Sequence, residues 1–474
     1  MVQVKGKRRV DATEGPMFSK MLFFVIPLML TNLLNNLYNM ADNIVIGQFS
    51  GDPTALAAIG VTGSLNSFFV NFAVGISAGA GVIVARNFGA KDKNGLSRSV
   101  HTAIALSVIV GIIIGILRFI LSEGALVLMG TRAELLPNSV LYCKILALGM
   151  PGTIVFTFSS AVLRSVGDSK TSLYAAASTG ILNVILNLFF VLVCGMSVAG
   201  VALATVVAKY ASAAITMCVL IKRRDEDYAF DFKKLCLDRK MVKDILYIGI
   251  PSAVQSVIYS VTNIFATAAA NPFPLPAISA KTVATNIDTL LGSSITTYLH
   301  ATLTFASQNY GAKKPERIKK SIFIAAIQST IIGLSVGLIM LLFREQLVGM
   351  YLAPTDPDTA EILKYATEIM VIMLPTYFIG AISDSLSGFL RGLGASISAM
   401  VSSILGVCAF RIAWIFFIFP YFKTLTGLYM MYPVSWTITI IASSILSIIA
   451  FKKAKREILA STEAASEPAV VKVN

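Results

Sequence analysis

Twelve apolar stretches separated by short polar segments dominate this sequence. They cover approximately residues 20–46, 55–85, 100–122, 137–163, 170–194, 198–221, 244–270, 277–307, 321–343, 362–390, 394–419 and 425–451. Each is long enough to cross a bilayer core, which takes about 20 helical residues. Because a backbone in lipid must satisfy its own hydrogen bonds, the stretches predict helices. We therefore predict an all-α integral membrane protein with twelve transmembrane helices.

The composition excludes several classes of protein. Of the 474 residues, 56 % are hydrophobic and 14 % are charged, whereas about 25 % of the residues of a soluble domain are charged. A disordered chain, a secreted disulfide scaffold and an ordinary cytosolic enzyme do not fit these values. The five cysteines form no CxxC pattern and there are only two histidines, so we expect no zinc site. No Walker A pattern or nucleophile–base arrangement is present, so we expect no enzyme activity.

The formal charge of +14 reflects membrane topology. Thirty of the 39 Lys and Arg residues lie in the two tails and in the loops that follow the even-numbered predicted helices. In a chain that crosses the membrane twelve times, these segments all lie on one side. By the positive-inside rule this side is cytoplasmic. Both termini are thus predicted in the cytoplasm, and the basic excess does not indicate a nucleic-acid partner.

The second half of the sequence repeats short motifs of the first half at a spacing of about 222–227 residues. Arg-Asn-Phe-Gly-Ala-Lys at 86–91 recurs as Gln-Asn-Tyr-Gly-Ala-Lys at 308–313. Ile-Pro in the first predicted helix recurs in the seventh, and Leu-Arg-x-x-Gly recurs after the fourth and tenth. Each unit has six helices, an even number, so both units begin on the same side of the membrane. This predicts two parallel six-helix repeats.

This repeat predicts two lobes about a central cavity, the usual architecture for alternating access. The expected units are a cytoplasmic tail at 1–19, an N-lobe at 20–221, a basic cytoplasmic linker at 222–243, a C-lobe at 244–451 and a second cytoplasmic tail at 452–474.

Polar residues inside the first predicted helix are candidates for a functional site. Asn35, Tyr38 and Asp42 fall on one helical face with Thr31, beside a second stripe of asparagines. A carboxylate at membrane depth costs about 2.5–3.5 kcal/mol, so it usually faces a cavity or a partner. The asparagines could instead join helices, and Asp42 could be an interfacial residue.

Two further helices of the first half carry polar residues. Asn183 and Asn187 are one turn apart in the fifth helix, and Thr205 and Lys209 share a stripe in the sixth. Lys209 lies too deep to reach the interface comfortably, and Asp42 is the obvious candidate partner. A structural ion pair and a charge that replaces a cation are both open interpretations.

The second half has its own buried charges. Asp288 lies in the eighth helix, Asp384 in the tenth and Arg411 in the eleventh. A buried structural pair between Asp384 and Arg411 is one interpretation of these residues. The substrate cavity is predicted to be lined by Asn35, Tyr259, Tyr298, Met373 and Tyr377.

Over residues 20–450 the chain resembles the multidrug and toxic compound extrusion (MATE) family. The resemblance rests on the two-repeat pattern, Pro27, Tyr38-x-x-x-Asp42-x-x-x-x-Gly47, and the duplicated motifs. It implies efflux of small, cationic or amphipathic compounds by antiport with H⁺ or Na⁺, from a prokaryotic cytoplasmic membrane. It also implies an acidic site formed by Asp42, Asn183, Asn187 and Thr205.

Two departures from the family pattern concern the coupling ion. Asn187 stands where the family often has Asp, and Lys209 where a neutral polar residue is usual. A single carboxylate facing a lysine suits proton exchange better than a Na⁺ site of several oxygen ligands. We expect no cofactor, and no metal other than a coupling Na⁺.

Other functions remain as alternatives. A flippase for lipid-linked precursors or polysaccharides of the same superfamily is the nearest, and a channel or a non-transporting membrane protein is more distant. The expected partners are small-molecule substrates and the lipid bilayer, and we expect the chain to be a monomer.

Overall fold

The computed structural model describes residues 9–49, 52, 54–352 and 358–466, and these residues form helices and connecting turns without a strand. The ends of the predicted tails, 1–8 and 467–474, lie outside the described residues. The first half contains α1 Met17–Phe49, α2 Ala55–Gly89, α3 Lys93–Leu128, α4 Leu136–Leu148, α5 Met150–Ser165, α6 Lys170–Leu188, η1 Phe189–Val193, α7 Val198–Lys222 and η2 Phe232–Lys234. The second half contains α8 Arg239–Ala270, α9 Leu275–Ile295, α10 Thr297–Gly311, α11 Pro315–Leu342, α12 Arg344–Gly349, α13 Thr359–Gly392, α14 Ser396–Ser403, η3 Ile404–Ala409, α15 Phe410–Ala413, η4 Trp414–Ile418, α16 Phe419–Phe422, α17 Leu425–Tyr429 and α18 Met431–Ser466.

These helices account for the predicted spans. Ten helical segments of the described chain are long and apolar enough to cross a membrane, and α4 with α5, bent by 49°, makes an eleventh. The remaining predicted span, 277–307, is divided into α9 and α10. It falls short of the apolarity of the others because α9 carries several threonines and Asp288.

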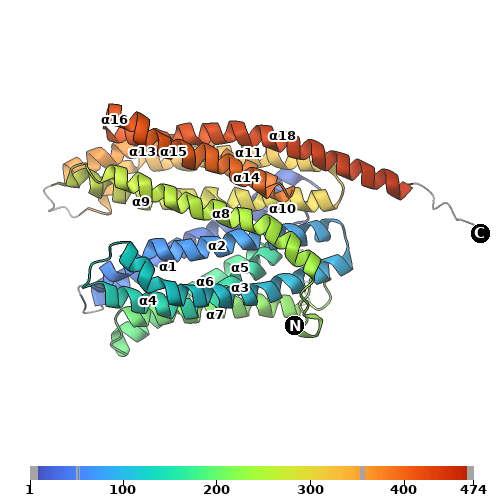
Figure 1. Cartoon of the computed structure of the whole chain (residues 1–474), viewed down its shortest axis with the longest axis horizontal. Coiled ribbons are helices and arrows are strands. Elements are labelled where there is room, and N and C mark those ends of the chain that lie inside the picture. Colours follow the sequence, from blue (N-terminus) through green and yellow to red (C-terminus); the bar gives the residue numbers. More distant parts are fainter. Residues whose placement is uncertain (1–8, 50–51, 53, 353–357, 467–474) are drawn as a thin grey trace, which may run out of the picture.

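The helices form two lobes, as Figure 1 shows: α1 to α7 lie on one side of the molecule and α8 to α18 on the other. The repeated motifs adopt the same backbone in both lobes. Lys91 and Lys313 have positive φ angles of 55° and 54°, and Gly167 and Gly394 have φ angles of 85° and 82°. The internal repeat predicted from the sequence is therefore a structural repeat.

The lobes meet through an unusually close contact between α2 and α8. A Cβ atom on Gly75 would lie 2.3 Å from the Cα of Ala253, and one on Gly79 would lie 2.1 Å from the carbonyl oxygen of Ile245. Glycine allows two helix backbones to approach in this way. The Gly-rich run at 75–81 thus serves helix packing.

The homologous motifs of the two repeats touch each other. A Cβ on Gly89 would lie 1.9 Å from the carbonyl oxygen of Gln308, and a Cβ on Gly311 would lie 1.9 Å from that of Arg86. The ends of α2 and α10 therefore cross at a point of pseudo-twofold symmetry. We call the side of the molecule at this crossing the terminal face, because Ala12 before α1 and Glu457 in α18 both contact α10 there.

A strap formed by residues 9–15 connects the two lobes at the terminal face. The backbone N–H of Val10 donates to the carbonyl of Gly167 in the N-lobe over 3.0 Å. The N–H of Ala12 donates to Oε1 of Gln308 in the C-lobe over 2.9 Å. The strap and the α2–α8 contact hold the lobes together on this side.

The start of the predicted linker, 222–243, is also tied to the terminal face. Arg223 donates from Nη2 to Oδ2 of Asp168 over 2.5 Å and from Nη1 to the hydroxyl of Tyr228 over 2.6 Å. Asp168 is buried and also accepts hydrogen bonds from Thr171 at the start of α6. The linker is thereby fixed to the N-lobe.

Replacing Gly79 with valine tests the lobe contact. The added side chain would meet the α8 backbone, and overpacking of this kind costs about 1–3 kcal/mol. We expect the purified Gly79→Val variant to unfold at a temperature several degrees lower than the wild type. Gly63→Val is the matched control, because no atom lies within 4 Å of a Cβ at Gly63 in the same helix. Equal losses in both variants would show that the close approach of α2 to α8 does not determine the effect.

Candidate functional site

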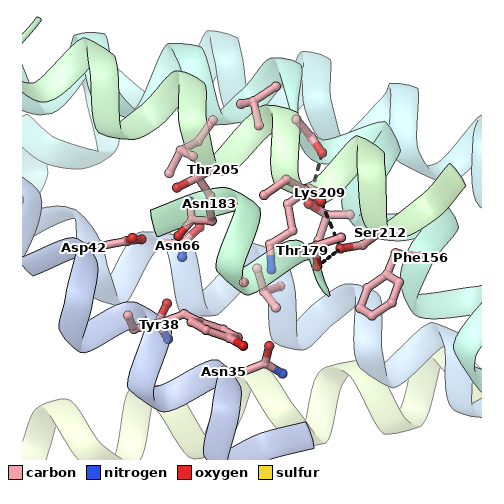
Figure 2. A pocket seen from close by; sticks show the side chains of 18 of the residues that line it. Asn35, Tyr38, Asp42, Asn66, Phe156, Thr179, Asn183, Thr205, Lys209 and Ser212 are labelled. Carbon is pink, nitrogen blue, oxygen red and sulfur yellow. Dashed lines mark hydrogen bonds between the residues drawn. The ribbon is translucent and has the colours of Figure 1, made fainter. Parts of the chain in front are cut away.

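A polar cavity of about 300 Å³ lies inside the N-lobe. Each of the helices α1 to α7 contributes to its wall, and Figure 2 shows Asp42, Asn66 and Asn183 near one another, with Lys209, Thr179 and Ser212 farther along. The polar and charged lining residues are Asn35, Tyr38, Asn39, Asp42, Asn66, Arg118, Tyr142, Thr153, Thr179, Asn183, Thr205, Lys209 and Ser212. The structure therefore brings together most residues of the predicted acidic site.

The two polar stripes of α1 have different surroundings. Asn35, Tyr38 and Asp42 face the cavity. From the adjoining stripe, Asn39 also lines the cavity. Its neighbours differ: Asn32 donates from Nδ2 to the carbonyl of Ser293 over 2.7 Å, and Asn36 donates to the Ser293 hydroxyl over 3.0 Å. Since Ser293 lies in α9, these two asparagines join the lobes, which is the helix-joining role considered for them.

Asp42 is held by an amide of α6. Asn187 is fully buried and donates from Nδ2 to Oδ1 of Asp42. The Oδ1 atom of Asn187 is buried without a hydrogen-bond partner. Asn183, one turn away, lines the same cavity. The carboxylate thus has amide donors and acceptors beside it, and one acceptor is unsatisfied.

Tyr38 lies against α6 because position 180 is glycine. A Cβ at Gly180 would be 1.7 Å from the Tyr38 ring. The Tyr38 hydroxyl donates to the carbonyl of Ala177 over 3.1 Å. This contact fixes the tyrosine at the cavity wall between α1 and α6.

Lys209 lines the cavity without an ion pair. No carboxylate oxygen of the described residues lies within 4 Å of its Nζ, so Lys209 and Asp42 share a cavity but are not directly paired in this conformation. Thr205, one turn before it, donates its hydroxyl to the carbonyl of Val201 over 3.0 Å.

Arg118 is a cavity residue that was not predicted from the sequence. The third apolar stretch was predicted to end at 122, which puts Arg118 near a loop, but α3 continues to Leu128. Arg118 is therefore buried, with 1 % of its surface exposed. The apolar residues after position 122 were the signal that could have revealed this.

The C-lobe contains a second cavity, of about 310 Å³. Asp288 and Arg411 both line it, together with Lys281 and two of the predicted substrate-cavity residues, Tyr259 and Met373. Oδ1 of Asp288 is buried without a hydrogen-bond partner.

Arg411 does not form the ion pair with Asp384 that the sequence allowed. The guanidinium donates from Nε to the hydroxyl of Ser435 over 2.9 Å and lies 4.2 Å from the ring centroid of Tyr432. Among the ion pairs of the described residues, none joins Asp384 to Arg411, and Arg391 and Thr296 are the polar neighbours of Asp384. A hydroxyl and an aromatic ring of α18 take the place of the carboxylate.

Two other predicted cavity residues lie in packed regions. Tyr298 is fully buried in a cluster with Met17, Phe24 and Phe305. Tyr377 packs on Trp436 with ring centroids 5.5 Å apart. Neither lines the N-lobe or the C-lobe cavity.

Comparison with known proteins identifies the family. A family model described as MatE matches residues 27–189 and 251–417, once in each lobe, and the chain belongs to this family. It is 24 % identical to the probable multidrug resistance protein YoeA of Bacillus subtilis, over 90 % of this chain and 93 % of that protein. It is 25 % identical to the probable multidrug resistance protein NorM of Thermotoga maritima, over 88 % and 89 %.

A solved structure has the same fold. It is described as the outward-facing conformation of a multidrug resistance MATE family transporter, and it matches with a TM-score of 0.82 at 22 % identity, over 96 % of this chain and 99 % of that one. The protein is thus a multi-pass membrane protein of a family of multidrug efflux transporters, and not an enzyme.

Gly180→Ala tests how Tyr38 is positioned. The new methyl group would overlap the ring, and we expect a loss of stability of about 1–3 kcal/mol, measured by thermal unfolding of the purified protein. In a Tyr38→Ala background the same substitution has room, so it should cost much less. A cost that is the same in both backgrounds would show that the ring contact does not determine the effect.

Proposed function

We propose that this protein exports small amphipathic compounds from the cytoplasm in exchange for protons, by alternating access to the N-lobe cavity. The observation that carries the proposal is Asp42, a carboxylate at membrane depth that lines a cavity and accepts a hydrogen bond from the buried Asn187. Ionisable residues within a membrane commonly mark proton or ion pathways.

The surroundings of Asp42 favour a proton over Na⁺. Sodium sites need several oxygen ligands, and Asp42 is the single carboxylate that lines the N-lobe cavity. Lys209 and Arg118 add positive charge to the same cavity, which opposes the binding of a metal cation. A proton needs only the carboxylate, so it is the simpler coupling ion.

Protonation of Asp42 would change its bond to α6. An ionised carboxylate accepts the Asn187 amide as a charge-assisted hydrogen bond, and the neutral acid accepts it more weakly. The unsatisfied Oδ1 of Asn187 offers an acceptor for the new O–H if the amide reorients. Pro27 lies inside α1 and removes one ladder hydrogen bond, so α1 can bend when its contact with α6 weakens.

The arrangement of the lobes supports an outward-facing state. The strap and the α2–α8 contact close the terminal face, and the positive-inside pattern assigns that face to the cytoplasm. A proton arriving at Asp42 from outside would release substrate, and loss of that proton inside would reset the transporter.

Asp42→Asn should abolish coupled export. Asparagine keeps the size of the side chain but cannot titrate, so we expect proton-driven efflux from proteoliposomes to fall at least about tenfold while the protein still folds and inserts. Wild-type transport by this variant would disprove the role of Asp42. Efflux by the wild type that follows a sodium gradient and ignores a pH gradient would assign the coupling to Na⁺.

Asp52→Asn is the matched control for this experiment. Asp52 lies in the connection between α1 and α2, where hydrogen bonds from the side chain and backbone of Thr54 keep the pKa of its carboxyl below the usual value. It therefore stays ionised when an ordinary carboxyl group would begin to titrate. We expect Asp52→Asn to keep its response to pH.

Lys209→Gln tests the charge beside Asp42. Removing the ammonium group lowers the repulsion that a metal cation meets in the cavity, so we expect transport to become sensitive to Na⁺ and its pH dependence to shift. Lys170→Gln, at the exposed start of α6, is the control. An unchanged response of Lys209→Gln to both ions would remove Lys209 from the mechanism.

A further inference from the structure

We infer that the N-lobe cavity contains a subsite for an anionic group of the substrate, a carboxylate on a small amphipathic molecule, and that Arg118 binds it. This inference rests on the proposed transport of small molecules and adds a chemical class to it. The resemblance to the family implies cationic or amphipathic compounds as substrates. The excess positive charge of this cavity instead favours an anionic group on the substrate.

The guanidinium of Arg118 is buried but only partly satisfied. Nη1 donates to Oδ1 of Asn66 over 2.9 Å and lies 3.5 Å from the sulfur of Met150. The ring of Phe69 lies 5.7 Å from Cζ. Nε and Nη2 are buried without a hydrogen-bond partner. A guanidinium has five N–H donors, so most of its hydrogen-bonding capacity is unused.

No carboxylate of the described residues neutralises this charge within 4 Å. Tyr142 and Cys143 of α4 are its titratable neighbours, and the Cys143 thiol is close enough to act as a weak acceptor for the guanidinium. Ser122 donates its hydroxyl to the Arg118 backbone carbonyl. A buried charge without a partner is strongly unfavourable. A carboxylate would satisfy the free N–H groups in the bidentate geometry that a guanidinium prefers.

The charge balance of the cavity agrees with this assignment. Arg118 and Lys209 face a single carboxylate, Asp42. Asp42 of α1 and Arg118 of α3 both line this cavity, together with Tyr142 of α4. The proton and the anionic group therefore bind at different residues. A cationic group elsewhere on the substrate could contact Asp42 and leave when Asp42 is protonated.

The size of the cavity favours a small molecule over a lipid-linked one. At about 300 Å³ it is at the lower end of the range for small-molecule sites. Its lining residues all belong to the N-lobe, whereas a polyprenyl chain would need an opening to the bilayer. The phosphate of a lipid headgroup is also anionic, so the competition experiment tests a phospholipid separately from a small carboxylate.

The test measures binding of two probes to the purified full-length protein by fluorescence polarisation. A rhodamine with a free carboxylate and its methyl ester differ by one negative charge. We expect wild-type protein to bind the acid about tenfold more tightly than the ester, which corresponds to about 1.4 kcal/mol. Arg118→Gln should reduce this preference to about twofold or less, and Arg118→Lys should retain part of it. Equal binding of the two probes by the wild type, or an intact preference in Arg118→Gln, would overturn the inference.

Controls separate binding at Arg118 from a general effect of positive charge on the protein. Arg132→Gln removes an exposed arginine and should leave the preference unchanged. If Arg118→Gln does not fold, competition on the wild type replaces it: benzoate should displace the rhodamine acid and benzamide should not. Displacement by phosphatidylglycerol micelles or by chloride, but not by benzoate, would refute a small-molecule carboxylate site. Because binding is measured without an ion gradient, a failure of proton coupling does not alter this result.

Discussion

The close contact of α2 with α8 is the constraint on which the rest of the structure depends. Gly75 and Gly79 allow the two backbones to meet, and this contact lies beside the crossing of α2 and α10. Together they determine how one lobe is placed against the other. The lobes are joined on one face, and polar groups deeper in the molecule are enclosed within each lobe. A buried charge there has to be stabilised by a ligand or by neighbouring dipoles.

The two lobes satisfy this requirement differently. In the C-lobe, Arg411 is held by Ser435 and by the ring of Tyr432, so its charge is largely accommodated by the protein. In the N-lobe, Arg118 keeps two nitrogen atoms without a partner, and Asp42 is the one carboxylate beside it in the cavity. The repeat therefore duplicates the scaffold but not the chemistry. In the C-lobe cavity the unpartnered buried atom is an acceptor, Oδ1 of Asp288, so the N-lobe with its unpartnered donors is the better candidate for binding an anionic group.

Much of this could be predicted from the sequence, because hydropathy and repetition are local signals. The twelve apolar stretches, the two repeats and the cavity-facing stripe of Asp42 needed only spacing and helical periodicity. Partners across helices could not be predicted. The sequence allowed Asp384 beside Arg411, but the helix rotations direct Arg411 to Ser435, and Tyr298 lies in a packed core. Arg118 was missed because the end of α3 was placed too early.

The strap formed by residues 9–15 constrains how the protein can assemble. Ala12 contacts Gln308 and Arg317 of the C-lobe, which follow it by 296 and 305 residues. Residues 9–15 therefore lack these contacts during synthesis until α10 and α11 have been made. Docking of the strap onto the C-lobe is therefore a late step of folding, which follows the synthesis of both repeats up to α11.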